Sequence, residues 1–171
     1  MKLHDNCPFA VAAIGENDAD EIDRSECCRR LGWYWLNWPE EPLCRSRGTE
    51  EEAYRFSWQS SFNGDASVHI GRNDRLIRLC WHKFGTPAAF APLSLDDWHE
   101  LQKAIDAARF WSLESGRKAI GGFDGAQWLI EGRRRNDFHA LQRWSPGGAI
   151  QELGRLFFAL AGPPLACIEP Y

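Results

Sequence analysis

Long apolar runs are absent from this sequence. No stretch approaches the roughly 18 consecutive apolar residues that a membrane-spanning helix needs, so we expect no membrane crossing. The opening residues, MKLHDNCPFAVAAIG, contain an acid and a proline where a secretory signal has an uninterrupted apolar core, and no clear cleavage pattern follows them. These two absences predict a cytoplasmic protein.

An excess of positive charge is also missing. The 171-residue chain has a net charge of −4 and a pI near 5.7. A protein that binds nucleic acid usually presents a basic surface to the phosphates. The sequence therefore predicts no nucleic-acid partner.

None of the six cysteines belongs to a CxxC pair, the spacing that is typical of a zinc site. In a cytoplasmic protein they are expected to be reduced, and small buried apolar side chains are the favoured interpretation. The alternative is a metal site in which Cys80 and His82, on one face of a strand, join Cys44 and either Cys27 or Cys28. We expect no metal and no other cofactor.

The motifs of several common catalytic sites are absent as well. The sequence has no HExxH motif, and Ser145 lies in a Ser-Pro turn instead of a GxSxG elbow. Gly121-Gly122 precede a strand, whereas a phosphate-binding glycine loop leads into a helix. No nucleophile with a matched base is evident, so the sequence favours a protein that is not an enzyme.

Aromatic residues, in contrast, are abundant, with nine Trp and ten Phe. Most of them must lie in the core because each buries a large area, while some can form a recognition surface. A shift of composition near residue 50 follows a turn-rich stretch at residues 39–49. We therefore expect an acidic, Trp-rich N-terminal segment, residues 1–50, packed on a main domain, residues 51–171.

The N-terminal segment carries the whole net charge, because it holds ten acids and six bases while the remaining charges cancel. Helical spacing from Cys27 or Cys28 to Trp38 predicts a helix that ends at Pro39, with a strand as the alternative. Its acids form either a solvated surface or a patch that attracts a basic partner. The candidate partner-binding residues are the acids and the aromatic side chains that follow them: Glu16, Asp18, Asp20, Glu21, Asp23, Glu26, Trp33, Tyr34, Trp35 and Trp38.

The main domain begins with three runs that have the alternating pattern of strands. AYRFSWQSSF and ASVHIGR are joined by Asn63-Gly64-Asp65, which predicts a hairpin, and RLIRLCWHKF predicts a third strand. Ser94 and Asp97 form a capping-box pattern before an apolar stripe of Trp98, Leu101, Ile105 and Ala108. A last helix is expected from about Ala149 to Ala161, with Gly162 at its C-terminal end.

A second hairpin is expected at positions 124–146, DGAQWLIEGRRRNDFHALQRWSP. We place the turn at Arg135, which sets Glu131 opposite His139, and a slip of one residue would exchange the two faces of one strand. The solvent-exposed face of the hairpin then holds Gln127, Glu131, His139 and Arg143. The core face then holds Trp128, Ile130, Phe138, Ala140 and Trp144.

The order of these elements predicts an α+β fold, with an antiparallel sheet of about five strands and helices packed mainly on one face. If Glu131, His139 and Arg143 pair across the strands on a solvent-exposed face, their presence needs no catalytic role. The alternative interpretation makes them an active site in which the carboxylate orients the imidazole and the guanidinium binds an anionic small molecule or ester.

Five stretches resemble blocks shared by a group of uncharacterised bacterial proteins: AYRFSW, LSLDDWHELQKAIDAARFWSL, FDGAQWLIEG, FHALQRWSP and LGRLFFALAG. The blocks YRF, LS..EW…FW.L, DGAQW.lEG and RWSP occur in that order, and the resemblance covers residues 53–162. It supports the domain assignment and implies no catalytic residue. A small acidic α+β protein without catalytic motifs is also similar to the immunity proteins that bacteria make against toxins. The sequence therefore predicts a protein-binding module whose partner is a basic toxin.

Overall fold

The computed structural model describes residue 43 and residues 50–74, 76–83, 88–114, 116–118, 124–135, 137–163 and 165–170. The elements within these ranges are β1 (Glu52–Ser60), β2 (Gly64–Arg72), β3 (Ile77–Lys83), β4 (Ala89–Pro92), α3 (Leu95–Ala107), a 3-10 turn (Phe110–Ser112), β5 (Gly116–Lys118), β6 (Ala126–Arg134), β7 (Asp137–Trp144) and α4 (Ala149–Ala161).

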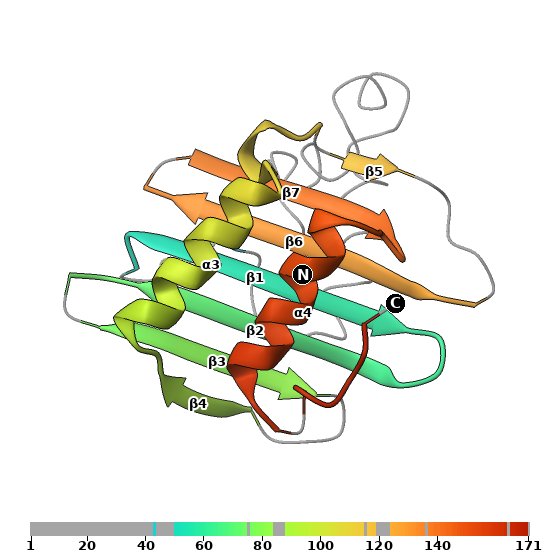
Figure 1. Ribbon diagram of the computed structural model, residues 1–171, viewed down its shortest axis with the longest axis horizontal. Coiled ribbons are helices and arrows are strands. Elements are labelled where there is room, and N and C mark those ends of the chain that lie inside the picture. Colours follow the sequence, from blue (N-terminus) through green and yellow to red (C-terminus); the bar gives the residue numbers. More distant parts are fainter. Residues whose placement is uncertain are drawn as a thin grey trace, which may run out of the picture.

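The strands form one seven-stranded sheet in the order β4-β3-β2-β1-β6-β7-β5 (Figure 1). All neighbours are antiparallel except β5 and β7, which pair in parallel. The predicted α+β class and antiparallel sheet are confirmed, whereas the expected number of about five strands is wrong. The two strands missed are the edge strands β4 and β5, which span four and three residues and are too short to show an alternating pattern.

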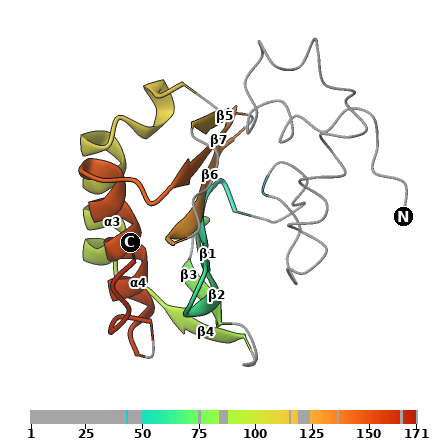
Figure 2. The same cartoon turned by 90° about the vertical axis from the view of Figure 1, so that its right-hand side faces the viewer.

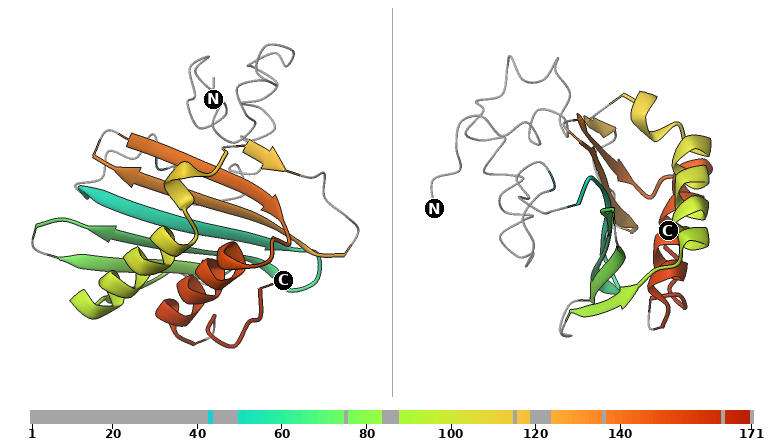
Figure 3. Two further views of the ribbon diagram at one scale, coloured as in Figure 1. Left: turned by 45° about the horizontal axis from the view of Figure 1, so that its top comes forward. Right: turned by 90° about the vertical axis from the view of Figure 1, so that its left-hand side faces the viewer.

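Helices α3 and α4 both lie on one side of the sheet, which we call the helix-covered face (Figures 2 and 3). The other side is called the second face. The predicted capping box of α3 is confirmed: the Ser94 hydroxyl accepts a hydrogen bond from the Asp97 backbone N–H at 3.1 Å, and the Asp97 carboxylate accepts one from the Ser94 N–H, also at 3.1 Å. Gly162 ends α4 with a φ of 69°, as expected.

Aromatic rings fill the helix-covered face. Phe56 in β1 contacts Trp128 in β6 and both phenylalanines of α4, Phe157 and Phe158, at centroid distances of 4.8, 5.8 and 5.2 Å. Gly154 lets α4 approach this layer, because a Cβ atom there would lie 2.2 Å from the Trp128 ring. The predicted apolar stripe of α3 is buried as well.

The register of β6 and β7 differs from the prediction by one residue. Arg134 pairs with Asp137, so the connection comprises two residues, and Glu131 lies opposite Ala140 instead of His139. Arg135 takes a φ of 54°, the left-handed conformation that two-residue hairpin turns require and that suits the twist of the strands.

The slip leaves the faces of β6 as predicted and exchanges those of β7. Trp128 and Ile130 belong to the core beneath the helices, as expected. Their cross-strand partners are Arg143 and Leu141, which therefore share the helix-covered face, as does His139, the partner of Gly132. The predicted core residues Phe138, Ala140 and Trp144 lie on the second face because side chains alternate along a strand.

The predicted N-terminal helix and the candidate residues from Glu16 to Trp38 lie outside the described residues. Within the ranges described above, neither helix has the length and apolar character that crossing a membrane demands.

Candidate functional site

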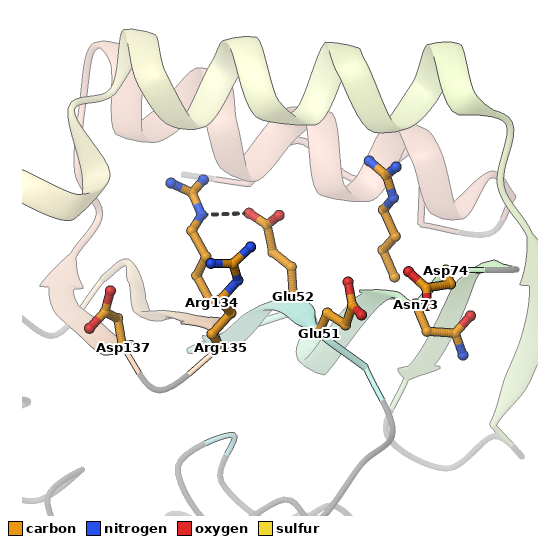
Figure 4. A pocket seen from close by; sticks show the side chains of 8 residues that line it. Glu51, Glu52, Asn73, Asp74, Arg134, Arg135 and Asp137 are labelled. Carbon is orange, nitrogen blue, oxygen red and sulfur yellow. Dashed lines mark hydrogen bonds and ion pairs between the residues drawn. The ribbon is translucent and has the colours of Figure 1, made fainter.

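A pocket of about 460 Å³ lined by described residues lies at one end of the strands, and we call it the strand-end pocket. It surrounds the start of β1, between the β2–β3 connection and the β6–β7 turn (Figure 4). Its lining residues are all charged or polar: Glu51, Glu52, Arg72, Asn73, Asp74, Arg134, Arg135 and Asp137.

Backbone hydrogen bonds fix the frame of this pocket. The Glu51 N–H donates to the Arg72 carbonyl at 2.9 Å, and the Arg135 N–H donates to the Glu51 carbonyl at 2.8 Å. Glu51 therefore joins both hairpins. On the β2 side the Asn73 side-chain oxygen accepts the Leu76 N–H at 3.0 Å and holds the turn in shape.

Three charged residues cross the sheet under α3, and we call them the Arg–Glu–Arg row. Glu52 in β1 is the register partner of Arg72 in β2 and of Arg134 in β6, so the three side chains share the helix-covered face. Arg134 Nε donates to Glu52 Oε1 at 2.9 Å. Arg72 instead lies with its guanidinium carbon 5.7 Å from the centroid of the Trp98 ring.

The carboxylate of Glu52 is held by several donors at once. Its Oε1 also accepts hydrogen bonds from the Tyr54 hydroxyl at 2.5 Å and from Gln102 Nε2 at 3.2 Å. Arg134 Nη2 donates in turn to the Tyr54 oxygen at 2.9 Å and to Gln102 Oε1 at 3.1 Å. Four side chains from β1, β6 and α3 thus orient one another, which makes this wall of the pocket rigid.

Tyr54 is electrostatically perturbed in this cluster. Burial, together with its hydrogen bond to the negative Glu52, raises the pKa of the Tyr54 hydroxyl to about 12. The hydroxyl therefore stays protonated at neutral pH and acts as a donor to Glu52. The indole of Trp111 donates to the same oxygen at 3.4 Å and also lies 5.1 Å from the Arg134 guanidinium carbon.

The remaining charges of the pocket are exposed. Glu51, Asp74, Arg135 and Asp137 all have exposed side chains, and within the described part of the chain none of them makes an ion pair. The pocket therefore combines one internally neutralised pair, Glu52 with Arg134, with charges of both signs that are open to a ligand.

The candidate catalytic residues Glu131, His139 and Arg143 do not converge. Glu131 lies on the second face, while His139 and Arg143 lie on the helix-covered face, so the sheet separates the carboxylate from the other two groups. The His139 ring packs 4.9 Å from Phe110, and burial lowers the pKa of its imidazole, with Arg143 adding to the effect. Arg143 Nη2 donates to the Glu114 carbonyl at 2.8 Å and so fastens the segment after the 3-10 turn.

Glu131 is the centre of a buried ion pair on the second face. Arg55 and Glu131 are register partners in β1 and β6, and both side chains are 0% exposed. Arg55 Nε donates to Glu131 Oε2 at 2.6 Å, and the backbone N–H of the buried Leu43 donates to Glu131 Oε1 at 3.1 Å. Both carboxylate oxygens are therefore used to hold the structure together.

The alternative metal site is not assembled by the described residues. Cys80 and His82 both belong to β3, and Cys80 is half-buried, while the side chain of His82 and the other proposed cysteine ligands lie outside the described part. Among the residues that the structure does describe, no three His, Cys, Asp or Glu side chains are grouped as a metal site would need.

A second surface with binding character lies along β4, at the edge of the sheet. Phe90 in β4 is 77% exposed, Leu95 at the start of α3 is 52% exposed, and Leu76 before β3 is 38% exposed. We call these three residues the exposed edge residues. The register partner of Phe90 is Cys80, so Phe90 lies on the second face, whereas Leu95 begins α3 on the other side of the sheet. Asp96 and Glu100 follow Leu95 in the sequence and are exposed on α3.

Comparison with protein-family models, with curated proteins and with solved structures finds no match to this chain. The resemblances to uncharacterised bacterial proteins and to immunity proteins therefore stay predictions.

The Arg–Glu–Arg row was missed by the sequence reasoning, although the chain contains a signal for it. Positions 50–52 read Glu-Glu-Glu and positions 133–135 read Arg-Arg-Arg. These two runs of opposite charge become neighbours when β1 pairs with β6, where Glu52 meets Arg134 and Glu50 meets Arg133 at 3.4 Å. Complementary charge at the ends of two strands thus indicated their pairing.

Proposed function

We propose that the protein is a non-enzymatic protein-binding module of the bacterial cytoplasm, and that it acts as an immunity protein by binding and blocking a basic toxin. The observation that carries this proposal is the exposure of Phe90 on the edge strand β4, together with the exposed edge residue Leu95 and the exposed acids of α3. Large aromatic side chains are enriched in protein interfaces, where they become buried at the centre of the contact.

The exposed charges of α3 favour a basic partner. Asp96, Glu100 and Asp106 are exposed on α3, and the exposed Lys103 and His99 lie between them in the sequence. Acidic side chains at the rim of an interface speed the encounter with a basic protein, while an anchored aromatic ring supplies most of the affinity. Phe90 is the best candidate for that anchor because of its exposure and its place on an edge strand.

The proposal extends to the N-terminal segment, whose composition has the same two properties. It gives the partner-binding role to the acids and aromatic residues Glu16, Asp18, Asp20, Glu21, Asp23, Glu26, Trp33, Tyr34, Trp35 and Trp38. Glu131 and Arg143 were candidate catalytic residues, but both make structural contacts. Glu131 accepts a hydrogen bond from Arg55, and Arg143 donates one to the Glu114 carbonyl. This supports binding over catalysis.

The test is a parallel capture experiment with the full chain immobilised and an extract of the source cells applied. We expect one basic protein to be retained by the unmodified chain and identified by mass spectrometry. Retention should fall at least about tenfold with Phe90→Ala, and again with the charge reversals Asp18→Lys, Asp20→Lys and Glu21→Lys. Co-expression of the chain should then protect cells from the captured protein.

Phe62→Ala is the matched control, because Phe62 is a comparably exposed phenylalanine, at 69%, in the β1–β2 turn. It should leave retention unchanged. If Phe90→Ala and Phe62→Ala behave alike, or if the captured protein is harmless to cells that lack this chain, the proposal of an immunity function is wrong.

A further inference from the structure

We propose that the strand-end pocket binds a small zwitterion of the α-amino-acid class, a ligand that carries one ammonium and one carboxylate group. This inference goes beyond the proposed protein binding, which concerns the exposed edge residues and the N-terminal segment. It depends on the charges of the pocket, on how they are arranged and on how firmly part of the wall is held.

The charge content of the pocket favours a ligand with both signs. Four carboxylates and three guanidinium groups line it, and only Glu52 and Arg134 neutralise each other. A purely anionic ligand would meet the three other carboxylates, and a purely cationic ligand would meet the two other guanidinium groups. Like charges brought together in an interface cost several kcal/mol, whereas a zwitterion gives each sign a partner.

Both ends of the pocket hold both signs, because Arg72 and Asp74 lie at the β2–β3 connection and Arg135 and Asp137 at the β6–β7 turn. Glu51 and Asp74 lie toward the β2–β3 connection, whereas Arg135 lies at the β6–β7 turn (Figure 4). Because the Arg135 N–H is hydrogen-bonded to the Glu51 carbonyl at 2.8 Å, these acidic and basic side chains leave from adjoining backbone positions. The ammonium group is assigned to Glu51 and Asp74 and the ligand carboxylate to Arg135.

Glu52 provides a fixed acceptor between these two ends. Its Oε1 accepts hydrogen bonds from Tyr54, Gln102 and Arg134, whereas Oε2 accepts none from the described residues. The side chain is 21% exposed and lines the pocket. A carboxylate that is already oriented loses little further freedom on binding, so Oε2 can accept an ammonium N–H at low entropic cost.

The Arg72 guanidinium is also pre-oriented, because it lies against Trp98 with its carbon atom 5.7 Å from the ring centroid. A pocket of about 460 Å³ lies within the ordinary range for small-ligand sites, so an α-amino acid with a short side chain fits.

The inference is tested by titrating three probes of nearly equal size into the isotopically labelled full chain. L-Alanine carries both charges, L-alaninamide only the ammonium and N-acetyl-L-alanine only the carboxylate. The backbone amides of Glu51 and Arg135, which border the pocket, report binding by NMR. We expect saturable shifts with L-alanine at a Kd on the order of 1 mM, and binding about tenfold weaker for each singly charged probe.

Substitutions assign the two ends of the ligand. Arg135→Gln should reduce the affinity for L-alanine about tenfold, to the affinity that the wild type has for L-alaninamide. The affinity for L-alaninamide itself should not change. The double variant Glu51→Gln, Asp74→Asn should bind L-alanine only as weakly as the wild type binds N-acetyl-L-alanine. Arg78→Gln removes an exposed arginine of β3 that does not line the pocket, and should change nothing.

The inference is overturned if the three probes bind equally, if L-alanine produces no saturable shift at concentrations of about 50 mM, or if the shifts lie away from the pocket. Unchanged amide shifts in the core of each variant establish that the fold is intact. None of these outcomes depends on protein capture, so failure here and failure of the proposed function are distinguishable.

Discussion

The two faces of the sheet are buried by different means. The helix-covered face is closed by aromatic rings from β1, β6 and α4, which pack at centroid distances of about 5 to 6 Å. The second face has at its centre a fully buried ion pair, Arg55 with Glu131, flanked by the buried hydroxyls of Ser57 and Ser67. Close packing of apolar side chains therefore stabilises the helix-covered face, and a buried ion pair contributes at the centre of the second face.

This difference predicts two kinds of sensitivity. Apolar packing tolerates substitutions that conserve volume, because the attraction is spread over many weak contacts. A buried ion pair concentrates its energy in two groups, so the loss of one partner leaves an uncompensated charge away from water.

Glu131→Gln should have the largest effect. It leaves the guanidinium of Arg55 buried without its counter-charge, and we expect the free energy of unfolding to fall by about 3 to 5 kcal/mol in urea denaturation followed by Trp fluorescence. Replacing both partners together, with Arg55→Met and Glu131→Leu, should cost much less. If the single and double variants are equally destabilised, charge is not what holds the second face.

Gly154→Ala should be the most damaging small change on the helix-covered face. The added Cβ would lie 2.2 Å from the Trp128 ring, so α4 must shift, at a cost of about 1 to 3 kcal/mol in the same denaturation assay. Gly147→Ala is the matched control, since nothing lies within 4 Å of a Cβ at that position. Equal stability of the two variants would contradict the close packing of α4.

Tyr54→Phe should cost about 1 to 2 kcal/mol, because it removes the hydroxyl that donates to Glu52 and accepts from Arg134. The raised pKa of about 12 gives a pH signature. The stabilisation is complete below the unfolded-state pKa near 10 and is lost as the pH rises toward 12. Ultraviolet titration of the wild type should show one tyrosinate forming near pH 12, and Tyr54→Phe should remove that step.

Substitution of His139 should have the smallest effect on the free energy of unfolding at neutral pH, and the effect should grow as the pH falls. Its folded-state pKa lies below the ordinary 6.5 because burial disfavours the charged imidazole. The unfolded chain therefore takes up the proton first, and stability should fall below pH 6.5 by at most about 1.4 kcal/mol per pH unit. His139→Gln should flatten that slope, whereas His99→Gln, on the exposed side of α3, should keep it.

Much of the fold could be predicted from the sequence because local signals were strong. The capping box at Ser94 and the end of α4 at Gly162 determine short-range geometry, and each lies where expected. The first hairpin also forms, but its loop comprises residues 61–63 instead of the predicted 63–65, because Gly64 already pairs with Ser60. The two edge strands escaped prediction since their few residues gain order from the neighbouring strand rather than from their own pattern.

The candidate site was harder to predict, because it depends on strand order and on a register that differs by one residue. Whether Arg135 is the centre of a three-residue turn or the first residue of a two-residue turn decides the face on which His139 lies. The strand-end pocket requires β1 to lie between β2 and β6. Nothing in the local sequence of β1 specifies that placement, apart from the opposite charges at positions 50–52 and 133–135.

The central position of β1 also has a consequence for biosynthesis. Its partner on one side, β2, follows directly in the chain, but its partner on the other side, β6, begins only at Ala126. At ribosomal rates of about 5 to 20 residues per second, one edge of β1 stays unpaired for an interval on the order of seconds, until β6 has been synthesised. During that interval Phe56 and Trp58 are exposed to other nascent chains, so we expect the yield of folded protein to depend on chaperones and on the speed of translation through residues 61–125.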